Sequence, residues 1–164
     1  MRIETAPCLL AAAALVGGMV AAAPARAASA SATMEVSLTV EAACRIDAGG
    51  LAFGTIDQSG ARTDSEAVLD LRCTPGAPFS VTLDEGRNGG GGTRRMADAS
   101  GMRSVAYDIY RDPARAQRWD AASPSTGIAP ADGRMSLIAY GRVAGGSAPA
   151  AARYADTVTV SVDF

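Results

Sequence analysis

The sequence contains neither histidine nor lysine, so arginine supplies all 15 of its cationic side chains. Without histidine the chain lacks the imidazole that acts as a general base in many enzymes and as a common metal ligand. The 17 acidic residues outnumber the arginines and give a net charge of −2, whereas a nucleic-acid-binding domain needs a basic face. The composition therefore argues against much common enzymology and against a nucleic-acid partner.

Aromatic residues are also scarce, at 5% of the chain, although 48% of all residues are hydrophobic. Alanine, valine and leucine supply most of the apolar volume, together with 18 glycines and 8 prolines. This composition suits short strands joined by many turns better than long helices. With 164 residues, the chain is long enough for one domain with its own core and too short for two ordinary ones.

The first 27 residues have the three parts of a secretory signal peptide. Arg2 supplies the positive start, an apolar run covers residues 8–23, and Ala25-Arg26-Ala27 has the small residues that signal peptidase requires. A retained membrane anchor is the alternative, but this run is shorter than the ~20 residues that cross a bilayer. We therefore expect cleavage after Ala27 and export of residues 28–164.

Only three cysteines are present, and Cys8 would leave with the signal peptide. In an oxidising compartment the remaining two, Cys44 and Cys73, should pair. A metal site would need further ligands, and a catalytic thiol would lack a partner base. We expect a disulfide that stabilises the fold by ~3–4 kcal/mol, because it closes a loop of about 30 residues.

Apolar and polar residues alternate repeatedly along the rest of the chain, as in half-buried strands. The alternating segments are 34–41, 67–73, 79–83, 105–110, 135–143 and 154–164, with shorter apolar pieces at 44–46 and 51–54. Turn signals separate them, and no helical period occurs after residue 28. The pattern predicts an all-β sandwich, in which Tyr154 would suit the corner tyrosine whose hydroxyl caps a backbone turn.

Three features could suggest ligand sites, but each has a simpler structural interpretation. The glycine-rich stretch 86–92 lacks the Gly-Lys-Ser/Thr ending of a phosphate loop, so we expect a hairpin connection. Trp119 has arginines nearby and could stack on a base, but the acidic balance favours a solvated loop with one anchoring tryptophan. Asp108 and Asp156 are interpreted as surface and turn residues. We expect no catalytic residue, metal ligand, cofactor or small-molecule substrate.

Short motifs occur in order across nearly all of residues 34–164. They are Val36-x-Leu38-x-Val40-x-x-x-Cys44, Leu51-x-Phe53-Gly54, Leu71-x-Cys73-Thr74-x-Gly76, Val81-Thr82-Leu83-Asp84-x-Gly86, Arg95-Met96, Val105-x-Tyr107-x-Ile109-Tyr110-Arg111-Asp112, Trp119, Tyr140-Gly141 and Tyr154-x-Asp156-Thr157-Val158. Together they resemble the spore coat protein U family, which includes subunits of archaic (Csu-type) chaperone–usher pili. One departure is that Ala151-Ala152-Arg153 stands where the family usually places a glycine.

The resemblance implies an incomplete immunoglobulin-like (pilin) sandwich that a donor strand from another subunit completes. Residues 28–41 would then be the donor-strand segment and residues 42–164 the pilin-like domain. The donor side chains would be those of Met34, Val36, Leu38 and Val40. The edge of the acceptor groove would be lined by Val158, Val160, Val162 and Phe164. An ordinary first strand that pairs within its own subunit is the alternative interpretation of residues 34–40.

The same resemblance implies a structural subunit of an extracellular pilus that serves adhesion and biofilm formation. Its partners would be further copies or other pilin subunits, a periplasmic chaperone and an outer-membrane usher, and it would pass through the periplasm to the cell surface. A secreted coat or matrix protein of the same family, which does not polymerise through an usher, is the main alternative. An exported enzyme or small-ligand binder is the third, and no motif in the sequence supports it.

Overall fold

The computed structural model describes residues 26–56, 60–146 and 149–164. The expected signal peptide lies outside this part except for its last two residues. The chain divides into two units, residues 1–38 and 39–164. Residues 26–43 have no regular secondary structure, and the described residues from Cys44 onward form strands, turns and loops. Among the described residues no helix is long and apolar enough to cross a membrane.

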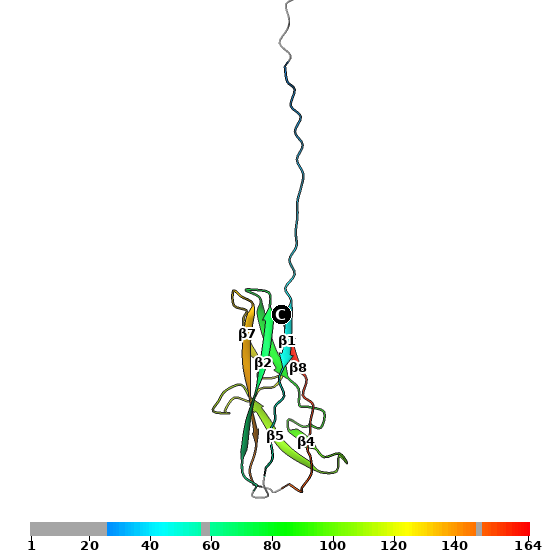
Figure 1. Cartoon of the computed structure of the whole chain (residues 1–164), viewed down its shortest axis with the longest axis vertical. Helices are drawn as coiled ribbons and strands as arrows, with labels where there is room; N and C mark the ends of the chain where they lie inside the picture. The colour runs from blue at the N-terminus through cyan, green and yellow to red at the C-terminus, as the bar shows by residue number, and fades with distance from the viewer. Residues whose placement is uncertain (1–25, 57–59, 147–148) are drawn as a thin grey trace, which may run out of the picture. The chain divides into compact units, whose positions relative to one another are not determined.

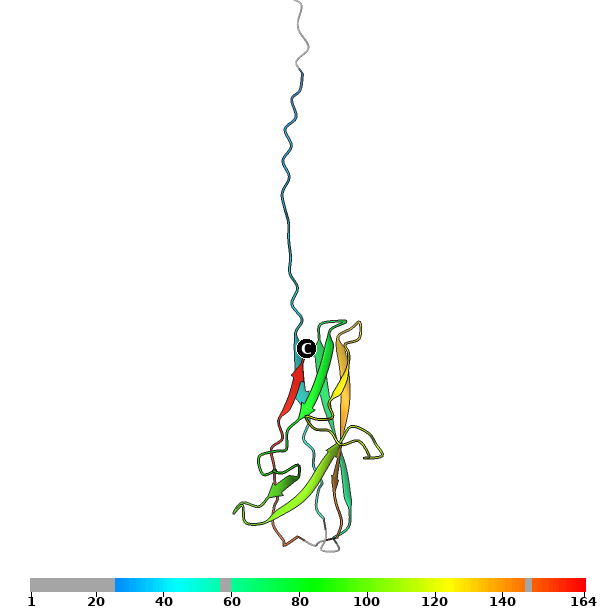
Figure 2. The same cartoon turned by 180° about the vertical axis from the view of Figure 1, so that it is seen from behind.

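The described residues of the second unit form eight strands in two antiparallel sheets (Figure 1). They are β1 (Cys44–Ala48), β2 (Thr63–Cys73), β3 (Pro78–Leu83), β4 (Arg94–Ala97), β5 (Ser104–Tyr110), β6 (Ser125–Ile128), β7 (Arg134–Val143) and β8 (Val160–Asp163). The larger sheet has the order β1-β2-β7-β5-β4 and the smaller sheet β6-β3-β8. Figure 2 shows the red strand β8 beside the green strand β3, its only strand partner within the described residues.

The core lies between the inner faces of these sheets, where the predicted alternation places its apolar side chains. On β2 the buried residues are Ala67, Leu69, Leu71 and Cys73, while the residues between them are exposed. β2 pairs with β7 over ten residues, and Leu69 lies opposite Leu137. The alternation of buried and exposed residues therefore fixes the register, because a shift by one residue would turn the apolar set outward.

Trp119 belongs to this core and anchors the loop between β5 and β6, as the sequence predicted. Its side chain is 1% exposed, and its indole nitrogen donates a hydrogen bond to the Val81 carbonyl oxygen at 2.8 Å. Its backbone nitrogen also donates to the carbonyl oxygen of Ile109 at 2.9 Å. The one tryptophan thus ties the smaller sheet to β5 of the larger sheet.

Two strands, β4 and β6, were not predicted from the sequence, and two expected strand segments, 34–41 and 51–54, have no strand structure. β4 and β6 have four residues each, too few to display an alternating pattern. Residues 51–54 carry no strand, and the expected strand over 154–164 is regular only in its last part, Val160–Asp163. Residues 51–54 follow β1 at the edge of the larger sheet, and residues 154–159 precede β8 at the edge of the smaller sheet. Each segment therefore lies where a second strand partner is lacking among the described residues.

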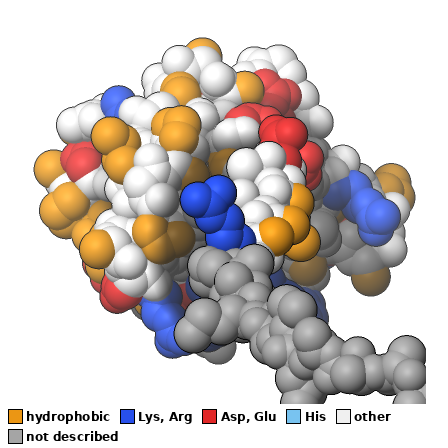
Figure 3. Space-filling view, turned by 90° about the horizontal axis from the view of Figure 1, so that it is seen from above, with side chains coloured by type: hydrophobic (Ala, Val, Ile, Leu, Met, Phe, Trp, Pro, Cys, Tyr) orange, Lys and Arg blue, Asp and Glu red, His pale blue; other side chains and the backbone are white. Residues whose placement is uncertain are grey.

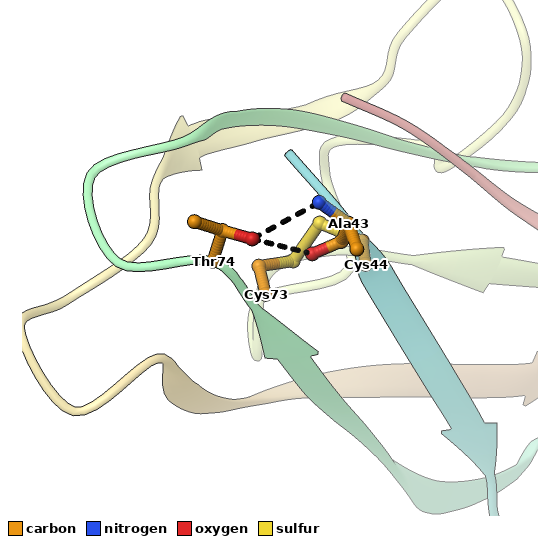
Figure 4. Close-up of a disulfide and its surroundings, with 4 residues drawn as sticks. All are labelled: Ala43, Cys44, Cys73 and Thr74. Carbon is orange, nitrogen blue, oxygen red and sulfur yellow. Dashed lines mark hydrogen bonds between the residues drawn. A yellow bond between two sulfur atoms is a disulfide. The ribbon is translucent and has the colours of Figure 1, made fainter. Parts of the chain in front are cut away.

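The disulfide expected from the sequence is confirmed, since Cys44 and Cys73 are bonded and lie opposite each other on β1 and β2. Beside it, the Ala43 nitrogen donates to the Thr74 hydroxyl oxygen at 3.0 Å (Figure 4). The Thr74 nitrogen in turn donates to the Ala43 carbonyl oxygen at 2.8 Å. A covalent bond and two hydrogen bonds therefore hold the start of β1 against the end of β2.

After β1 the chain stays on the larger sheet without forming a ladder. The Gly49 nitrogen donates to the Val68 carbonyl oxygen at 2.8 Å, and the Ser65 hydroxyl donates to the Ala52 carbonyl oxygen at 2.6 Å. The side chains of Leu51 and Phe53 lie over Gly141 of β7. A Cβ atom at position 141 would be 2.6 Å from Leu51 Cδ2 and 2.9 Å from Phe53 Cζ, so glycine there permits this packing.

We expect Cys73→Ser to lower the free energy of unfolding by about 3–4 kcal/mol, because the reduced chain regains loop entropy in its unfolded state. Urea unfolding followed by the fluorescence of Trp119 measures this change. Cys8→Ser is the matched control and should leave the mature protein unchanged. Equal urea midpoints for all three chains would contradict the prediction.

Gly141→Ala should destabilise the domain by about 1–3 kcal/mol, because the added methyl group overlaps the side chains of Leu51 and Phe53. Thermal unfolding provides the measurement. Gly50→Ala is the control, since a Cβ atom at position 50 has no atom within 4 Å. A melting temperature for Gly141→Ala as high as that of Gly50→Ala would show that the close packing is unimportant.

Candidate functional site

A groove with a volume of about 800 Å³ opens between the segments 48–56 and 149–160. The first segment follows β1 on the larger sheet, and the second leads into β8 of the smaller sheet. Its inner lining is mostly apolar and comes from both sheets: Ala67, Leu69, Leu83, Val105, Tyr107, Ile109, Ala139 and Val143. The hydrophobic core is therefore accessible along this groove.

The strand order explains why the groove is open. An immunoglobulin-like sandwich has strands A, B, E and D in one sheet and C, F and G in the other. β1, β2, β7 and β5 correspond to A, B, E and D, while β3 and β8 correspond to C and F. No strand of the described residues corresponds to G. β8 is consequently an edge strand whose outer N–H and C=O groups lack a ladder partner.

The four residues predicted for the groove edge have different positions. Val158 and Val160 line the groove. Val162 is half-buried and packs against the core beyond it, and the side chain of Phe164 is 55% exposed. The predicted apolar face of this segment therefore points inward up to Val162. The opposite wall includes Leu51 and Phe53, which the sequence predicted only as part of a short apolar segment.

The four residues predicted for the donor strand lie in a segment without strand structure. Met34, Val36, Leu38 and Val40 are between 74% and 87% exposed. An alternating segment becomes a half-buried strand only when a sheet edge and an apolar surface receive it.

Asp156, which the sequence predicted only as a turn residue, is hydrogen-bonded to two other parts of the domain. Its Oδ2 accepts a hydrogen bond from the Tyr107 hydroxyl at 2.7 Å. Its Oδ1 accepts from the backbone nitrogen and the side-chain nitrogen of Asn88, both at 3.1 Å. Burial, and then the bond to this carboxylate, raise the pKa of Tyr107. The hydroxyl therefore stays protonated as a donor at the inner end of the groove.

Asp84, which directly follows β3, also accepts hydrogen bonds through its carboxylate. Its Oδ1 accepts from the backbone nitrogens of Gly86 and Thr159, both at 2.9 Å. Burial alone would raise the pKa of Asp84, but the hydrogen bonds from Thr159 and Gly86 and the charge of Arg94 outweigh it and hold that pKa below its usual value. The carboxylate thus stays ionised near neutral pH.

Arg94 is 0% exposed and donates only to backbone oxygens among its hydrogen bonds. Its Nε bonds the Asp84 carbonyl oxygen at 2.8 Å, and one terminal nitrogen bonds the Trp119 carbonyl oxygen at 2.8 Å. Asp108, expected at the surface, is instead half-buried and pairs with Arg118 at 2.9 Å. Burial raises the pKa of Asp108 despite this pairing.

Tyr154 lies within the groove wall formed by residues 149–160, and its hydroxyl donates to the Ala150 carbonyl oxygen at 2.8 Å. This bond to a backbone oxygen four residues upstream is the one that a corner tyrosine makes. It forms although Ala151, Ala152 and Arg153 occupy the position of the family's usual glycine. This part of the groove wall therefore tolerates side chains at residues 151–153.

The lining of the groove is mostly apolar, and Tyr107, Asp156 and Arg153 are among its polar residues. Within 26–56, 60–146 and 149–164, no group of three or more acidic or cysteine side chains could hold a metal ion.

Outside the groove, the exposed large hydrophobic residues of the domain are Val68, Met102, Ile128, Ile138 and Phe164. In the view from above, hydrophobic side chains are interspersed with charged and other polar ones (Figure 3).

Comparison with known proteins identifies a relative and a structural neighbour. The chain is 31% identical to Protein U of Myxococcus xanthus over 181 residues, which cover 99% of this chain and 98% of that protein. A chain in the crystal structure of the CsuC–CsuE chaperone–tip adhesion subunit pre-assembly complex, from archaic chaperone–usher Csu pili of Acinetobacter baumannii, superposes with a TM-score of 0.60 at 23% identity.

That alignment covers 77% of this chain and 41% of the solved chain, so our chain spans about two fifths of its neighbour's length. The superposition confirms the predicted all-β, immunoglobulin-like fold. The family model of the Spore Coat Protein U domain matches residues 30–161, which include every motif that suggested the resemblance. This chain belongs to the Spore Coat Protein U domain family.

Proposed function

We propose that this protein is a structural subunit of an extracellular pilus, assembled by donor-strand exchange through a chaperone–usher system. One observation carries the proposal: the domain has an open apolar groove beside an unpaired strand edge, and the same chain has an exposed alternating segment. The groove lacks a strand, and residues 34–40 have the pattern of a strand without a sheet. If residues 34–40 of one copy added as a strand to the groove of the next copy, the groove would gain its missing strand and the segment would gain a sheet.

The energetics are sufficient for a non-covalent fibre. Burying four apolar side chains at ~1.5–3 kcal/mol each gives a gross ~6–12 kcal/mol per junction. A ladder of backbone hydrogen bonds along β8 adds to this stabilisation, because the edge otherwise presents unpaired groups to water. The donor side chains are Met34, Val36, Leu38 and Val40, and the receiving wall contains Val158 and Val160.

The connection between donor and domain is short. Two residues, Glu41 and Ala42, separate Val40 from Ala43, whose backbone is bonded to Thr74. Each residue spans at most ~3.6 Å, so the donor departs beside the disulfide. Successive domains in the fibre are consequently joined by a tight linker.

The expected signal peptide, the disulfide and the fold together support export through the periplasm to the cell surface. A periplasmic chaperone would cover the open groove until a donor strand replaces it, and an outer-membrane usher would be the site of exchange. The solved neighbour is described as a complex of a chaperone and a pilus tip subunit, which supports the same class of partner here. Adhesion and biofilm formation would be the roles of such a fibre.

A secreted coat protein that does not use an usher is the second candidate. The family's description as a spore coat domain and the resemblance to Protein U favour it. The two candidates differ in whether polymer formation depends on an usher. Export of the full chain with and without the usher of its source organism distinguishes them.

Leu38→Asp should abolish the polymers, because the groove would have to bury a carboxylate in place of a leucine side chain. The full chain is exported together with the chaperone and usher of its source organism, and polymers that survive SDS at room temperature are counted on gels. Ser37→Asp is the matched control, since it adds the same charge to the polar face of the same segment.

The wild-type and Ser37→Asp chains should give ladders of polymers, and the Leu38→Asp chain a disulfide-bonded monomer. A synthetic peptide with the sequence of residues 28–41 should bind this monomer, whose groove is intact. Equal polymerisation of all three chains, or monomers in every case, would refute donor-strand exchange.

A further inference from the structure

We propose that Asp84, Asn88 and Asp156 form a polar clamp that holds residues 155–159 extended before any strand arrives, so that the receiving edge is preformed. The inference rests on the proposed function, and names the residues that position its acceptor edge. These three residues are not part of the apolar groove predicted from the sequence. Their role is positioning, since they act on the backbone that receives the strand.

The need for a clamp follows from the limits of β8. The regular strand begins at Val160, yet the groove wall extends back along residues 149–160. Residues 155–159 must therefore keep an extended shape although they belong to no regular strand. At one end, Ala155 exchanges two backbone hydrogen bonds of 2.9 Å with Ala97 of β4. Two backbone bonds come from the turn after β3: the Asp84 nitrogen donates to the Thr159 carbonyl oxygen at 3.0 Å, and the Arg87 nitrogen to the Thr157 carbonyl oxygen at 2.9 Å.

Side chains supply the remaining bonds of the clamp. The Asp84 carboxylate accepts from the Thr159 nitrogen. The Asn88 side-chain nitrogen donates to the Ala155 carbonyl oxygen at 3.1 Å and also to Asp156. Together these contacts reach Ala155, Asp156, Thr157 and Thr159 from the turn at residues 84–88.

The clamp leaves the receiving groups free. In an antiparallel strand, the N–H and C=O groups of alternate residues point to opposite edges. Thr157 and Thr159 direct their groups toward the turn at 84–88. Val158 and Val160 therefore direct theirs toward the unpaired edge, while their side chains line the groove. An incoming strand meets a fixed row of donors and acceptors.

Two contacts anchor the clamp to the core. The Tyr107 hydroxyl, from β5 of the larger sheet, bonds Asp156, and the buried Arg94 bonds the Asp84 carbonyl oxygen. Gly86 lies between them with a φ of +81°, and a Cβ atom there would collide with the Asp156 carboxylate. The glycine lets the turn approach the groove wall closely enough to bond it.

Preformation should raise the rate of strand capture, because a segment that is already extended does not have to be ordered on binding. A clamp with a merely structural role would change the melting temperature but not the association rate. The two rates of peptide binding, association and dissociation, therefore separate these roles.

The test uses the full chain with Leu38→Asp as parent, so that its own donor cannot compete, and the peptide of residues 28–41 with a fluorescent label. Asn88→Ala removes two hydrogen bonds and Asp156→Ala removes three, so each variant should slow association by about tenfold or more. Asp156→Asn keeps an acceptor for Asn88 and a polar partner for Tyr107, so it should restore most of the rate. Ser136→Ala is the control, because it removes a hydroxyl–carboxylate bond to Asp70 on strands β7 and β2 and should leave the rate unchanged.

Hydrogen exchange of the parent without peptide provides a measurement that needs no further substitution. The amides of Arg87, Asn88 and Thr159 should exchange slowly, since each is bonded within the clamp. Exchange at the rate of a free loop, or association rates of the clamp variants equal to that of the parent, would overturn the proposal. Failure of the parent itself to bind the peptide would instead refute the proposed function.

Discussion

The fold is organised around the unpaired edge of β8. A strand with a partner on one side only leaves about half of its backbone N–H and C=O groups, those on the open edge, without a hydrogen-bond partner in the protein. In this domain that edge adjoins an apolar groove, so the same place lacks both a hydrogen-bonding partner and a hydrophobic cover. On its other edge, β8 and the segment before it are held by hydrogen bonds from the smaller sheet and the turn that follows β3. β3 pairs with β8, and the turn after β3 bonds the segment that precedes it.

The sequence predicts those parts of the structure that repeat a simple pattern. β2, β3, β5 and β7 have several buried residues in alternation, and each is close to its expected position. β4 and β6 are too short for a pattern, and their pairing depends on neighbours distant in sequence. The partners of Trp119 were also beyond local reasoning, because a tryptophan among arginines and aspartates has the composition of a surface loop, and only the fold brings it under Val81.

The groove could be predicted in part. Val158 and Val160 follow from alternation combined with the family resemblance, and the structure places both in the lining. Asn88 and Asp156 could not be predicted, since one lies in a glycine-rich turn and the other in a threonine-rich strand segment, which are both typical of exposed positions. Their contact joins residues 68 positions apart, and a pairing of that kind has no local signal.

The disulfide has a mechanical consequence for any fibre built in this way. Tension between neighbouring subunits would enter each domain through the two-residue linker that ends at Ala43. The adjacent bond between Cys44 and Cys73 transfers this load directly to β2, the long central strand between β1 and β7. β1 therefore cannot be peeled from the sheet one hydrogen bond at a time, and a pulled fibre should part at its junctions, where the strands slide in shear, before its domains unravel.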